Sequence, residues 1–487
     1  MAALGSRPSP RRSSGLQTSI VWTLALATGL LLGSCDLRDT SQETSSQAPV
    51  LQRYVEASTP AYSWESVGKT TVDGVECVEL RLTSQQWRGM RWRHQLIVAR
   101  PPASGSSSHG VLVIGGGTQD AMRKERGPRA GATSEQCELL AQAVGVSNQA
   151  AAFLRQVPNQ PLFDGLTEDE LISYTFDQFL ENPSEDTWPL LLPMTKSAVK
   201  AMDALQAYSA ENFPEKLEKF TVTGASKRGW TTWLTAAMDA RVSALAPMAF
   251  DILNMKPQLD HQLDAWGEYS SLISAYTERG LPHVADTPEG ERLIEIVDPY
   301  RYRDRVSQPK LIVLGTNDSY WPIDALNLYW KELRGEKHTM YLPNAGHGVQ
   351  NAEQVLGTVA AFARGATDEF TFPGIDASYS TGPGGGTLTV TPAETPGLKP
   401  AGIRLWRATS ADRDFRDAEF SARTIPAQDD GGYRAQVARP DQGYRALLGE
   451  VVYKVQNRTF SLSTRVRILA AEESSSGAHP SSAPAGD

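Results

Sequence analysis

Between residues 111 and 365 the chain alternates short apolar runs with longer amphipathic segments. The apolar runs have the length of strands and lie at 111–114, 220–224, 242–250, 309–315 and 338–343. The segments with helical spacing lie at 137–145, 197–209, 230–239, 325–333 and 352–365. A helix between two strands carries the chain back across the sheet, so the strands run parallel and the helices cover both faces. The alternation therefore predicts an α/β fold with a mostly parallel sheet, preceded by strands between about 72 and 100.

From about residue 368 the helical spacing disappears, and Gly, Thr and Pro become more frequent. The β-prone runs that follow are separated by turn residues: TLTVTP, GIRLWRA, YRAQVA, RALLGEVVYKV and RTFSLSTRVRIL. Short strands at this spacing predict an antiparallel, Ig-like β-sandwich. We therefore expect an α/β domain over 50–367, a β-sandwich domain over 368–470 and a disordered tail over 471–487.

The N-terminus has the parts of a bacterial secretory signal. Two arginines precede the apolar residues 19–32, and Leu-Gly-Ser then leads into Cys35. This ending resembles a lipobox, in which the cysteine is lipidated and becomes the new N-terminus. An ordinary signal peptide or an N-terminal anchor helix is the alternative, although the apolar run is short for a membrane span. We expect a lipoprotein signal peptide over 1–35 and a flexible polar tether over 36–49.

Export would place the chain in an oxidising compartment of the bacterial cell envelope, held to the membrane by its lipid. Asp36 resembles an inner-membrane retention signal of enteric bacteria, and the choice between the two membranes stays open. Beyond Cys35 only Cys77 and Cys137 remain. A disulfide between them and two buried free thiols are both compatible with the sequence.

The composition excludes several kinds of partner. The net charge is −9 and the body of the chain has no block of Lys or Arg, so nucleic acid is not expected as a partner. No His and Cys residues have zinc spacing, and neither a metal nor a cofactor is expected. The expected partners are a small-molecule or peptide substrate and the membrane.

The stretch TVTGASKRGWTTWL, residues 221–234, passes from a strand directly into an amphipathic helix with Ser226 in the turn. That is the setting of a nucleophile elbow, whose sharp turn lifts the serine Oγ above the sheet. The usual G-x-S-x-G pattern is imperfect, because Arg228 stands in place of the second glycine and Gly229 comes one residue later. A serine in an ordinary Gly-rich turn is the alternative, so the assignment needs an acid and a base.

Asp318 and His347 follow in the chain order that such an elbow requires. Each lies in a loop just after an expected strand, at the edge where open α/β sheets place their sites. None of the other six histidines has an equally good position. Asp324 and Asp251 are rival acids, but the first favours a helix cap and the second follows a different strand. We predict that Ser226, Asp318 and His347 form a catalytic triad.

Hydrolysis through this triad needs N–H donors for the oxyanion. The backbone of Lys227, directly after the serine, is one expected donor, and Gly116 and Gly117 in the Gly-rich loop after 111–114 supply the other. A mere tight turn is the alternative for that loop. The side chains of Lys227 and Arg228 are either solvated or favour an anionic substrate.

These motifs lie in a chain that resembles the PhoPQ-activated pathogenicity-related protein family, whose members resemble α/β-hydrolases. The resemblance covers about residues 50–470, including RDFR at 413–416, and implies an α/β-hydrolase-type sheet and the same triad. Where the family typically has a short phenylalanine-rich loop after its acid, this chain has Ser-Tyr-Trp, ending in Trp321. The resemblance rests on LQRYVEASTPAYSWE, PNQPLF, EDELISYTF, WPLLLPMTKSAVKAMDALQ, TGASKRGWTTWLTAAMDARV, IVDPYRYRDRV, GTNDSYWPIDALNLYWKEL and YLPNAGH.

Residues 158–189 are acidic and aromatic and too long for a simple connection. They form either a lid or wall over the site or a packed irregular insertion. In the first case Trp188, Asp186 and Glu185 would line the site, and we predict substrate-binding roles for Trp188 and Trp321.

The leading hypothesis is an exported serine hydrolase that cleaves an ester or amide. GTND resembles the acid loop of prolyl-oligopeptidase-like peptidases, whereas GASKRG resembles the elbow of glucuronoyl esterases, so peptidase and carboxylesterase both stay open. The alternative is a non-enzymatic envelope or signalling protein on a hydrolase scaffold. The C-terminal sandwich binds a partner or glycan, or only packs on the hydrolase domain.

Overall fold

The computed structural model describes residues 48–101, 107–119, 134–367, 370–382, 384–429, 432–455 and 458–472. The described residues form one compact unit. The expected signal peptide, the lipidation site at Cys35, nearly all of the tether and all but two residues of the expected tail lie outside the described residues. Within the described part, no helix has the length and hydropathy needed to cross a membrane.

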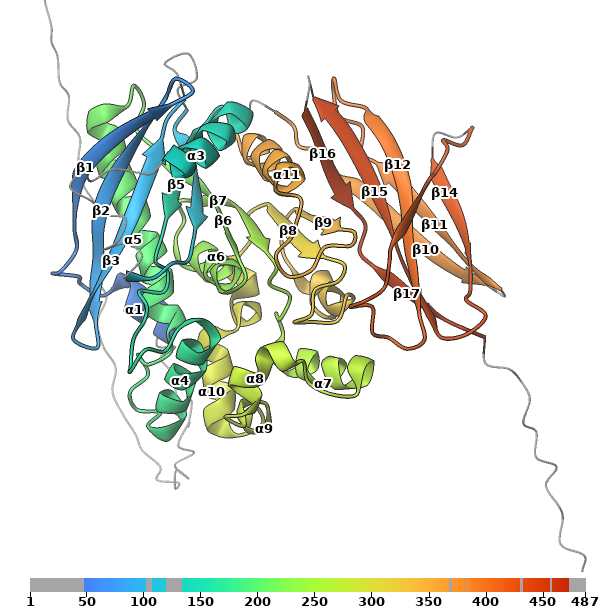
Figure 1. The fold of residues 1–487 in the computed structure, drawn as a ribbon, viewed down its shortest axis with the longest axis horizontal. Coiled ribbons are helices and arrows are strands. Elements are labelled where there is room, and N and C mark those ends of the chain that lie inside the picture. Colours follow the sequence, from blue (N-terminus) through green and yellow to red (C-terminus); the bar gives the residue numbers. More distant parts are fainter. Residues whose placement is uncertain are drawn as a thin grey trace, which may run out of the picture. The chain divides into compact units, whose positions relative to one another are not determined.

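A mostly parallel sheet forms the centre of the fold (Figure 1). Its parallel strands lie side by side in the order β5-β4-β6-β7-β8-β9. Their bounds are β4 His109–Ile114, β5 Ala150–Leu154, β6 Lys219–Ala225, β7 Val242–Met248, β8 Lys310–Gly315 and β9 Lys337–Leu342. Antiparallel strands extend this sheet beyond β5, namely β3 Met90–Ala99, β2 Val75–Trp87 and β1 Ser63–Val72.

The strand order determines where a site can form. The connection that leaves β4 leads to β5 on one side, whereas the connection that leaves the adjacent strand β6 leads to β7 on the other side. Such a reversal opens a crevice at the carboxyl ends of the strands. Every residue of β8 is buried, as expected for a strand covered on both faces. Together with its helices this is an α/β-hydrolase-type sheet, as the sequence predicted.

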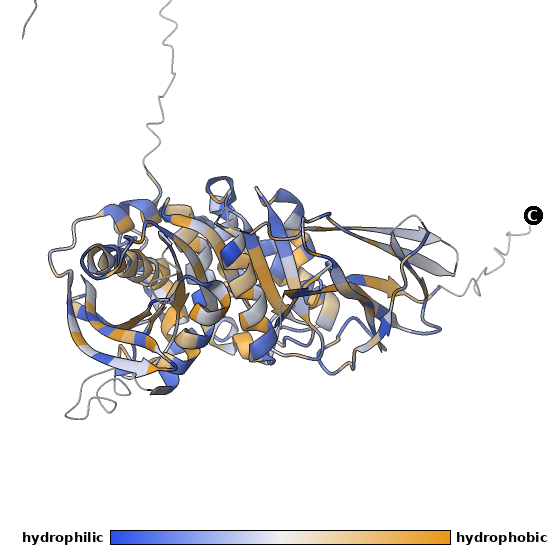
Figure 2. Ribbon diagram, turned by 90° about the horizontal axis from the view of Figure 1, so that it is seen from above, coloured by the Kyte–Doolittle hydropathy of each residue, from blue (hydrophilic) through white to orange (hydrophobic). Residues whose placement is uncertain are grey.

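Helices cover both faces of the sheet. α3 (Ser134–Ser147) and α11 (Ala352–Gly365) contact each other on one face, and α5 (Leu191–Asn212) and α6 (Lys227–Met238) contact each other on the opposite face, with α1 (Val50–Glu56). Figure 2 shows mostly hydrophobic residues along the central strands and both kinds of residue along the helices. This is the amphipathic pattern from which the helices at 137–145, 197–209, 230–239 and 352–365 were predicted.

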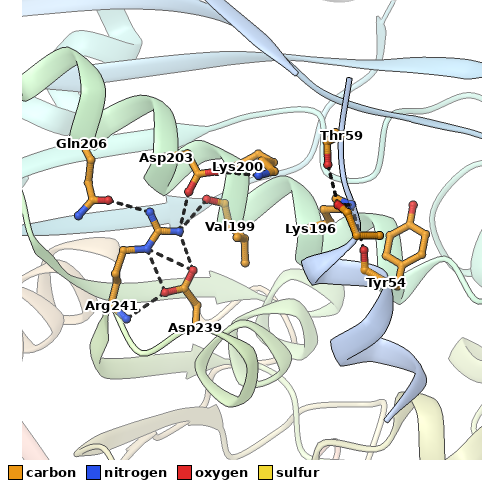
Figure 3. Close-up of polar contacts among 10 residues, drawn as sticks. Tyr54, Thr59, Lys196, Val199, Lys200, Asp203, Gln206, Asp239 and Arg241 are labelled. Carbon is orange, nitrogen blue, oxygen red and sulfur yellow. Dashed lines mark hydrogen bonds and ion pairs between the residues drawn. The ribbon is translucent and has the colours of Figure 1, made fainter. Parts of the chain in front are cut away.

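Polar contacts fix the helices of the second face to one another (Figure 3). Arg241, just after α6, pairs with Asp203 of α5 at 2.8 Å and donates to Gln206 Oε1 of α5 at 2.9 Å. Lys196 of α5 donates its Nζ to the carbonyl of Tyr54 in α1 at 2.9 Å. The position of α6, whose N-terminus follows Ser226, is therefore held by a partly buried ion pair as well as by packing.

Another group of helices gathers at the end of the sheet where β6, β7 and β8 finish (Figure 1). They are α4 Glu168–Glu181, α7 Met255–Trp266, α8 Ser274–Thr277, α9 Leu281–Val284 and α10 Pro288–Val297, joined by the 3-10 helices η2 Ser271–Ile273 and η3 Pro299–Arg305. α4 contacts both α8 and α10. Residues 158–189 thus contain a regular helix that the sequence did not predict.

Two further predictions of local structure need correction. Residues 325–333 form two 3-10 turns, η4 (Ala325–Leu328) and η5 (Trp330–Glu332), where a helix was expected. Tyr329 between them has φ −135°, outside the helical range, and interrupts the run. β5 was missed because its sequence AAAFL is rich in Ala, which has low strand propensity.

The C-terminal region forms two antiparallel sheets that share a core. The smaller sheet has β10 Ile375–Gly382, β11 Gly385–Pro392 and β14 Tyr433–Ala438, and the larger has β12 Pro400–Ser410, β13 Ser421–Thr424, β15 Tyr444–Val455, β16 Arg458–Ser463 and β17 Arg467–Ala470. Leu388 and Leu405 from the two sheets belong to one hydrophobic cluster. Ser463 of β16 pairs with Thr339 of β9, so the larger sheet continues the central one across the expected boundary at residue 367.

Cys77 of β2 and Cys137 of α3 form a disulfide. The two cysteines lie in a small hydrophobic cluster between the first strands and α3. The bridge therefore joins α3 to the antiparallel end of the central sheet.

Candidate active site

Ser226 lies between β6 and α6 in a strained backbone conformation. Its φ is 58° and its ψ is −126°, a region that residues with a side chain rarely adopt. The backbone N–H of Ser226 donates to the carbonyl of Met248, at the end of β7, at 2.9 Å. This bond holds the sharp strand-to-helix turn that the sequence suggested.

Two glycines let the turn approach its neighbours. A Cβ on Gly224 would lie 2.7 Å from the carbonyl oxygen of Arg228, and one on Gly229 would lie 2.8 Å from that of Met248. The second glycine of this elbow is therefore needed one residue later than in the usual pattern. Arg228 at the usual position directs its side chain away from the turn, toward α4.

The structure brings the three predicted triad residues together. His347 Nε2 lies 2.8 Å from Ser226 Oγ, and His347 Nδ1 lies 2.9 and 3.1 Å from the two carboxylate oxygens of Asp318. Asp318 follows β8 and His347 follows β9, so all three side chains stand at the carboxyl ends of parallel strands. A neutral imidazole that donates from Nδ1 to Asp318 can accept the Ser226 proton at Nε2.

The two rival acids have other partners. Asp324 Oδ1 lies 2.7 Å from His261 Nε2, and the other oxygen accepts from Arg413 at 3.2 Å. Asp251 is buried and accepts a hydrogen bond from the Tyr329 hydroxyl at 2.6 Å. The geometry therefore selects Asp318 as the partner of the histidine.

Burial raises the pKa of Asp251 to about 7. The nearby charges of Asp318 and Asp324 raise this pKa further, and the hydrogen bond from Tyr329 opposes the rise. A carboxyl group that binds a proton near neutral pH therefore lies in the core close to the triad acid.

The C-terminal region holds the loop that carries the acid. Asn317, directly before Asp318, donates its side-chain Nδ2 to the carbonyls of Phe415, Arg416 and Ala418 at 3.2, 3.0 and 2.8 Å. These carbonyls lie in the loop between β12 and β13. Sequence reasoning did not find this contact, although the RDFR stretch was part of the family resemblance.

Tyr320 packs directly against the histidine. Its ring centroid is 4.0 Å from that of His347, and its backbone N–H donates to Asp318 Oδ1 at 2.9 Å. Its hydroxyl donates to Asp169 of α4 at 3.2 Å. Burial, followed by the negative charge of Asp169, raises the pKa of Tyr320, so this hydroxyl stays a donor.

The two cations beside the serine are paired with carboxylates of α4. Lys227 Nζ lies 2.8 Å from Asp169 and 3.4 Å from Glu168. Arg228 makes two hydrogen bonds to Glu168, at 2.7 and 2.6 Å. Burial opposes the ionisation of Glu168, but the hydrogen bonds and charge of Arg228 outweigh it and lower the pKa of Glu168 to about 2. Neither cation is solvated. The carboxylates of α4 neutralise both positive charges, so neither is available to attract an anionic substrate.

The Gly-rich loop after β4 lies close to the elbow. A Cβ on Gly116 would lie 2.6 Å from the guanidinium of Arg228, so the loop passes directly over this side chain. Gly117 has φ +117°, which favours glycine. The loop therefore lies against the Arg228 side chain of the elbow, while the role of Lys227, Gly116 and Gly117 as oxyanion donors stays a prediction.

Trp188 does not reach the site. Its ring lies 6.1 Å from that of Trp87, and the guanidinium of Arg88 covers it at 3.9 Å. Asp186 pairs with Arg53, and Glu185 pairs with Arg88. The expected lining role of these three residues is therefore wrong, because they contact α1, the end of β2 and the turn after it instead.

A cavity opens beside the serine. It has an empty volume of about 970 Å³, part of it open to solvent, and Ser226, His347, Tyr320 and Trp321 form part of its wall. Trp321 thus lines it as predicted, and α4 contributes Asp169 and Phe176. The rest of the wall comes mainly from the segment with α7, α9 and α10. In the described part of the chain, no cluster of side chains is suited to hold a metal ion.

Two sequence comparisons identify relatives. The sequence model of the PhoPQ-activated pathogenicity-related protein family matches residues 51–416. Autocrine proliferation repressor protein A of Dictyostelium discoideum is 31% identical over 433 residues, which cover 83% of this chain and 85% of that protein.

Solved structures show more distant likeness. Acetyl xylan esterase 1 from Thermoanaerobacterium aligns over 65% of this chain and 92% of its own, with 15% identity and a TM-score of 0.44. An S-formylglutathione hydrolase from Agrobacterium tumefaciens aligns over 62% of this chain and 96% of its own, with 12% identity and a TM-score of 0.39. Likeness at this level carries no argument about chemistry.

Proposed function

The chain belongs to the PhoPQ-activated pathogenicity-related protein family, and we propose that it is an exported serine hydrolase that cleaves an ester or amide bond. The observation that carries this proposal is the unbroken chain of hydrogen bonds from Asp318 through His347 to Ser226. A serine in a strained turn, bonded to a histidine that a carboxylate orients, is the arrangement of an activated nucleophile.

The chemistry follows from these contacts. His347 Nε2 takes the proton of Ser226 Oγ as this oxygen bonds to the substrate carbonyl carbon. The imidazolium is stabilised by Asp318 and then gives its proton to the leaving group, as the bond between that group and the carbonyl carbon breaks. Water, deprotonated by the same histidine, hydrolyses the acyl-enzyme and restores Ser226.

The oxyanion needs donors already in place. Lys227 is the first residue of α6, so its backbone N–H has no acceptor within the helix. An N–H of Gly116 or Gly117, in the loop over Arg228, is the proposed second donor. The ion pairs of Lys227 and Arg228 with α4 hold this part of the elbow in place.

The test uses the chain from residue 36 on, which contains the whole compact unit. It is assayed on p-nitrophenyl esters and on p-nitroanilides of short peptides. We expect ester hydrolysis that Ser226→Ala lowers by about a thousandfold or more in kcat/KM. Anilide hydrolysis in addition to ester hydrolysis would favour the peptidase class. Equal rates for parent and Ser226→Ala would overturn the proposal.

A non-enzymatic signalling role is the second candidate. The name of the Dictyostelium relative describes repression of proliferation, and a hydrolase fold alone does not establish activity. Cells exposed to purified parent and to Ser226→Ala decide between the two roles. An equal effect of both proteins on proliferation would favour signalling without catalysis.

We also propose that the chain is a bacterial envelope lipoprotein anchored through Cys35. The lipobox-like ending of the signal peptide supports this, and the Cys77–Cys137 disulfide is typical of an oxidising compartment. Radiolabelled palmitate should enter the parent and not Cys35→Ala. Labelling of both proteins would exclude Cys35 as the lipid site.

A further inference from the structure

The wall of the cavity beside Ser226 is almost entirely hydrocarbon. Its polar members are few: Ser226, His347, Asp169 and Lys227, and the polar tips of some aromatic rings. The rest are mainly aliphatic and aromatic side chains that follow β7 or belong to α4, α7, α9 and α10. Apolar surface of this extent favours a ligand group that is itself apolar.

Most polar side chains of the wall already have partners within the protein. Asp169 accepts hydrogen bonds from the hydroxyls of Tyr276 at 2.9 Å and Tyr320 at 3.2 Å, and it pairs with Lys227 at 2.8 Å. Trp230 donates its Nε1–H to the carbonyl of Val297 at 2.6 Å. Few hydrogen-bond donors or acceptors of the wall are therefore free to bind a polar group of the substrate.

A charged substrate group would be disfavoured in this cavity. Among the described residues of the wall, Asp169 carries the only carboxylate and Lys227 the only ammonium, and these two neutralise each other. An incoming charge would lose its hydration without gaining a free counter-charge. The cavity therefore selects against substrates that carry a free carboxylate. A uronic-acid ester, which the elbow sequence suggested, has no such charge but is disfavoured for another reason, since its sugar hydroxyls would find few partners here.

We infer that this cavity is an acyl-binding site and that the substrates are uncharged esters of medium-length aliphatic or aromatic acids. The inference rests on the proposed hydrolase function. The acyl group is the part that stays bonded to Ser226 Oγ until water releases it, so a cavity whose wall includes Ser226 and His347 holds this group through both half-reactions.

The first test is a series of p-nitrophenyl esters from acetate to decanoate, together with esters that end in a free carboxylate at the far end of the acyl chain. Each methylene buried in the cavity raises kcat/KM by about fourfold until the cavity is filled. The terminal carboxylate lowers kcat/KM by at least about tenfold against the uncharged ester of equal length. A parallel series of acetate esters with alcohols of increasing length should show no such rise.

Variants at two matched positions on α7 locate the effect. Leu259 lines the cavity, whereas Leu263, one turn later on the same helix, is 38% exposed and does not. Leu259→Trp fills the cavity and shifts the optimum to shorter chains, and Leu259→Ala shifts it to longer ones. Leu263→Trp keeps the chain-length profile of the parent. Thermal unfolding verifies that each variant is folded.

The outcomes separate this inference from the proposed function. A fluorophosphonate probe that labels Ser226 would support the hydrolase function. If the acetate and octanoate esters then have equal kcat/KM, or esters with a terminal carboxylate are preferred, the acyl-site inference is wrong and the hydrolase function stands. A rise with alcohol length alone assigns the cavity to the leaving group and overturns the acyl assignment. If no ester is cleaved and Ser226 is not labelled, both ideas fail.

A binding measurement tests the cavity without turnover. Decanol, an uncharged probe, should bind Ser226→Ala in calorimetry, and adding Leu259→Trp should weaken the binding by about tenfold. Decanol binding that is absent, or that Leu259→Trp leaves unchanged, would overturn the placement of an apolar ligand in this cavity.

Discussion

At the scale of single residues, the site depends on Ser226 being held in a backbone conformation that its own side chain disfavours. The hydrogen bond to Met248 and the two close-packed glycines maintain it. The sequence pointed to Ser226, Asp318 and His347, which the fold brings together, because strand ends and chain order are local features. It did not show that Lys227 and Arg228 are neutralised, because their partners on α4 lie about 60 residues earlier in the chain.

Replacing the acid distinguishes the triad from its nearest rival. Asp318→Asn leaves His347 without a carboxylate, so we expect kcat to fall by about 10⁴-fold. Asp324→Asn breaks contacts with His261 and Arg413 only and should cost less than about tenfold. The measurement is kcat on an activated ester at one pH. A larger loss of kcat in Asp324→Asn than in Asp318→Asn would show that Asp318 is not the triad acid.

Asp251 should make stability depend on pH. A carboxyl group whose pKa is raised by folding, here to about 7, binds its proton more tightly in the folded state. The contribution of Asp251 to the free energy of unfolding is therefore full below its pKa in the unfolded state, near 4, and is lost as the pH rises through about 7. Relative to Asp251→Asn, the parent should lose about 1 kcal/mol of unfolding free energy per pH unit across this window.

Chemical denaturation of both proteins across this pH range measures the difference. The exposed Asp264 offers a matched control, and Asp264→Asn should follow the parent. Curves for the parent and Asp251→Asn that run parallel would show that Asp251 ionises normally.

At the scale of elements, loops from distant parts of the chain meet at the acid. The side-chain amide of Asn317 shares its two N–H groups among three carbonyls of the loop between β12 and β13, and so this loop holds the residue next to Asp318. Sequence periodicity predicts helices and strands but not which loops touch, and this contact spans about 100 residues. The same limit explains why Trp188 was misplaced, since its neighbours Trp87 and Arg88 come from β2 and the turn after it.

Asn317 should act as a positioning residue for the acid. Asn317→Ala frees the acid loop, and we expect kcat to fall by about tenfold to a hundredfold with little change in KM. Asn327 is a matched control, because it also donates to a C-terminal carbonyl, that of Val466, but contacts no triad residue. Asn327→Ala should lose stability and keep kcat. Equal losses of kcat in both variants would reduce the role of Asn317 to general stability.

At the scale of the whole molecule, the sequence predicted the parallel sheet, the helices on both faces and the β-rich C-terminal part. These follow from periodicity and turn residues. The continuity of the sheet through β9 and β16 could not be predicted, because pairing between strands so far apart leaves no local pattern. Nor could the sequence decide between a disulfide and two free thiols, since only the fold brings Cys77 and Cys137 together.

The disulfide should stabilise the compact unit. Its two cysteines are 60 residues apart, and closing a loop of this length in the unfolded chain is worth about 4 kcal/mol. The double variant Cys77→Ser and Cys137→Ser should lose a comparable amount in denaturant titration. Thiol titration of the unfolded, unreduced parent should find neither cysteine free. Two titratable thiols would show that the bridge does not form.

The most direct test of the central claim is whether Ser226 is an activated nucleophile. The chain from residue 36 on is treated with a fluorophosphonate probe beside Ser226→Ala and His347→Ala, and the adduct is located by peptide mass. We expect the parent alone to be labelled, on the peptide that contains Ser226. A folded parent that stays unlabelled, or equal labelling of Ser226→Ala, would contradict catalysis through this serine.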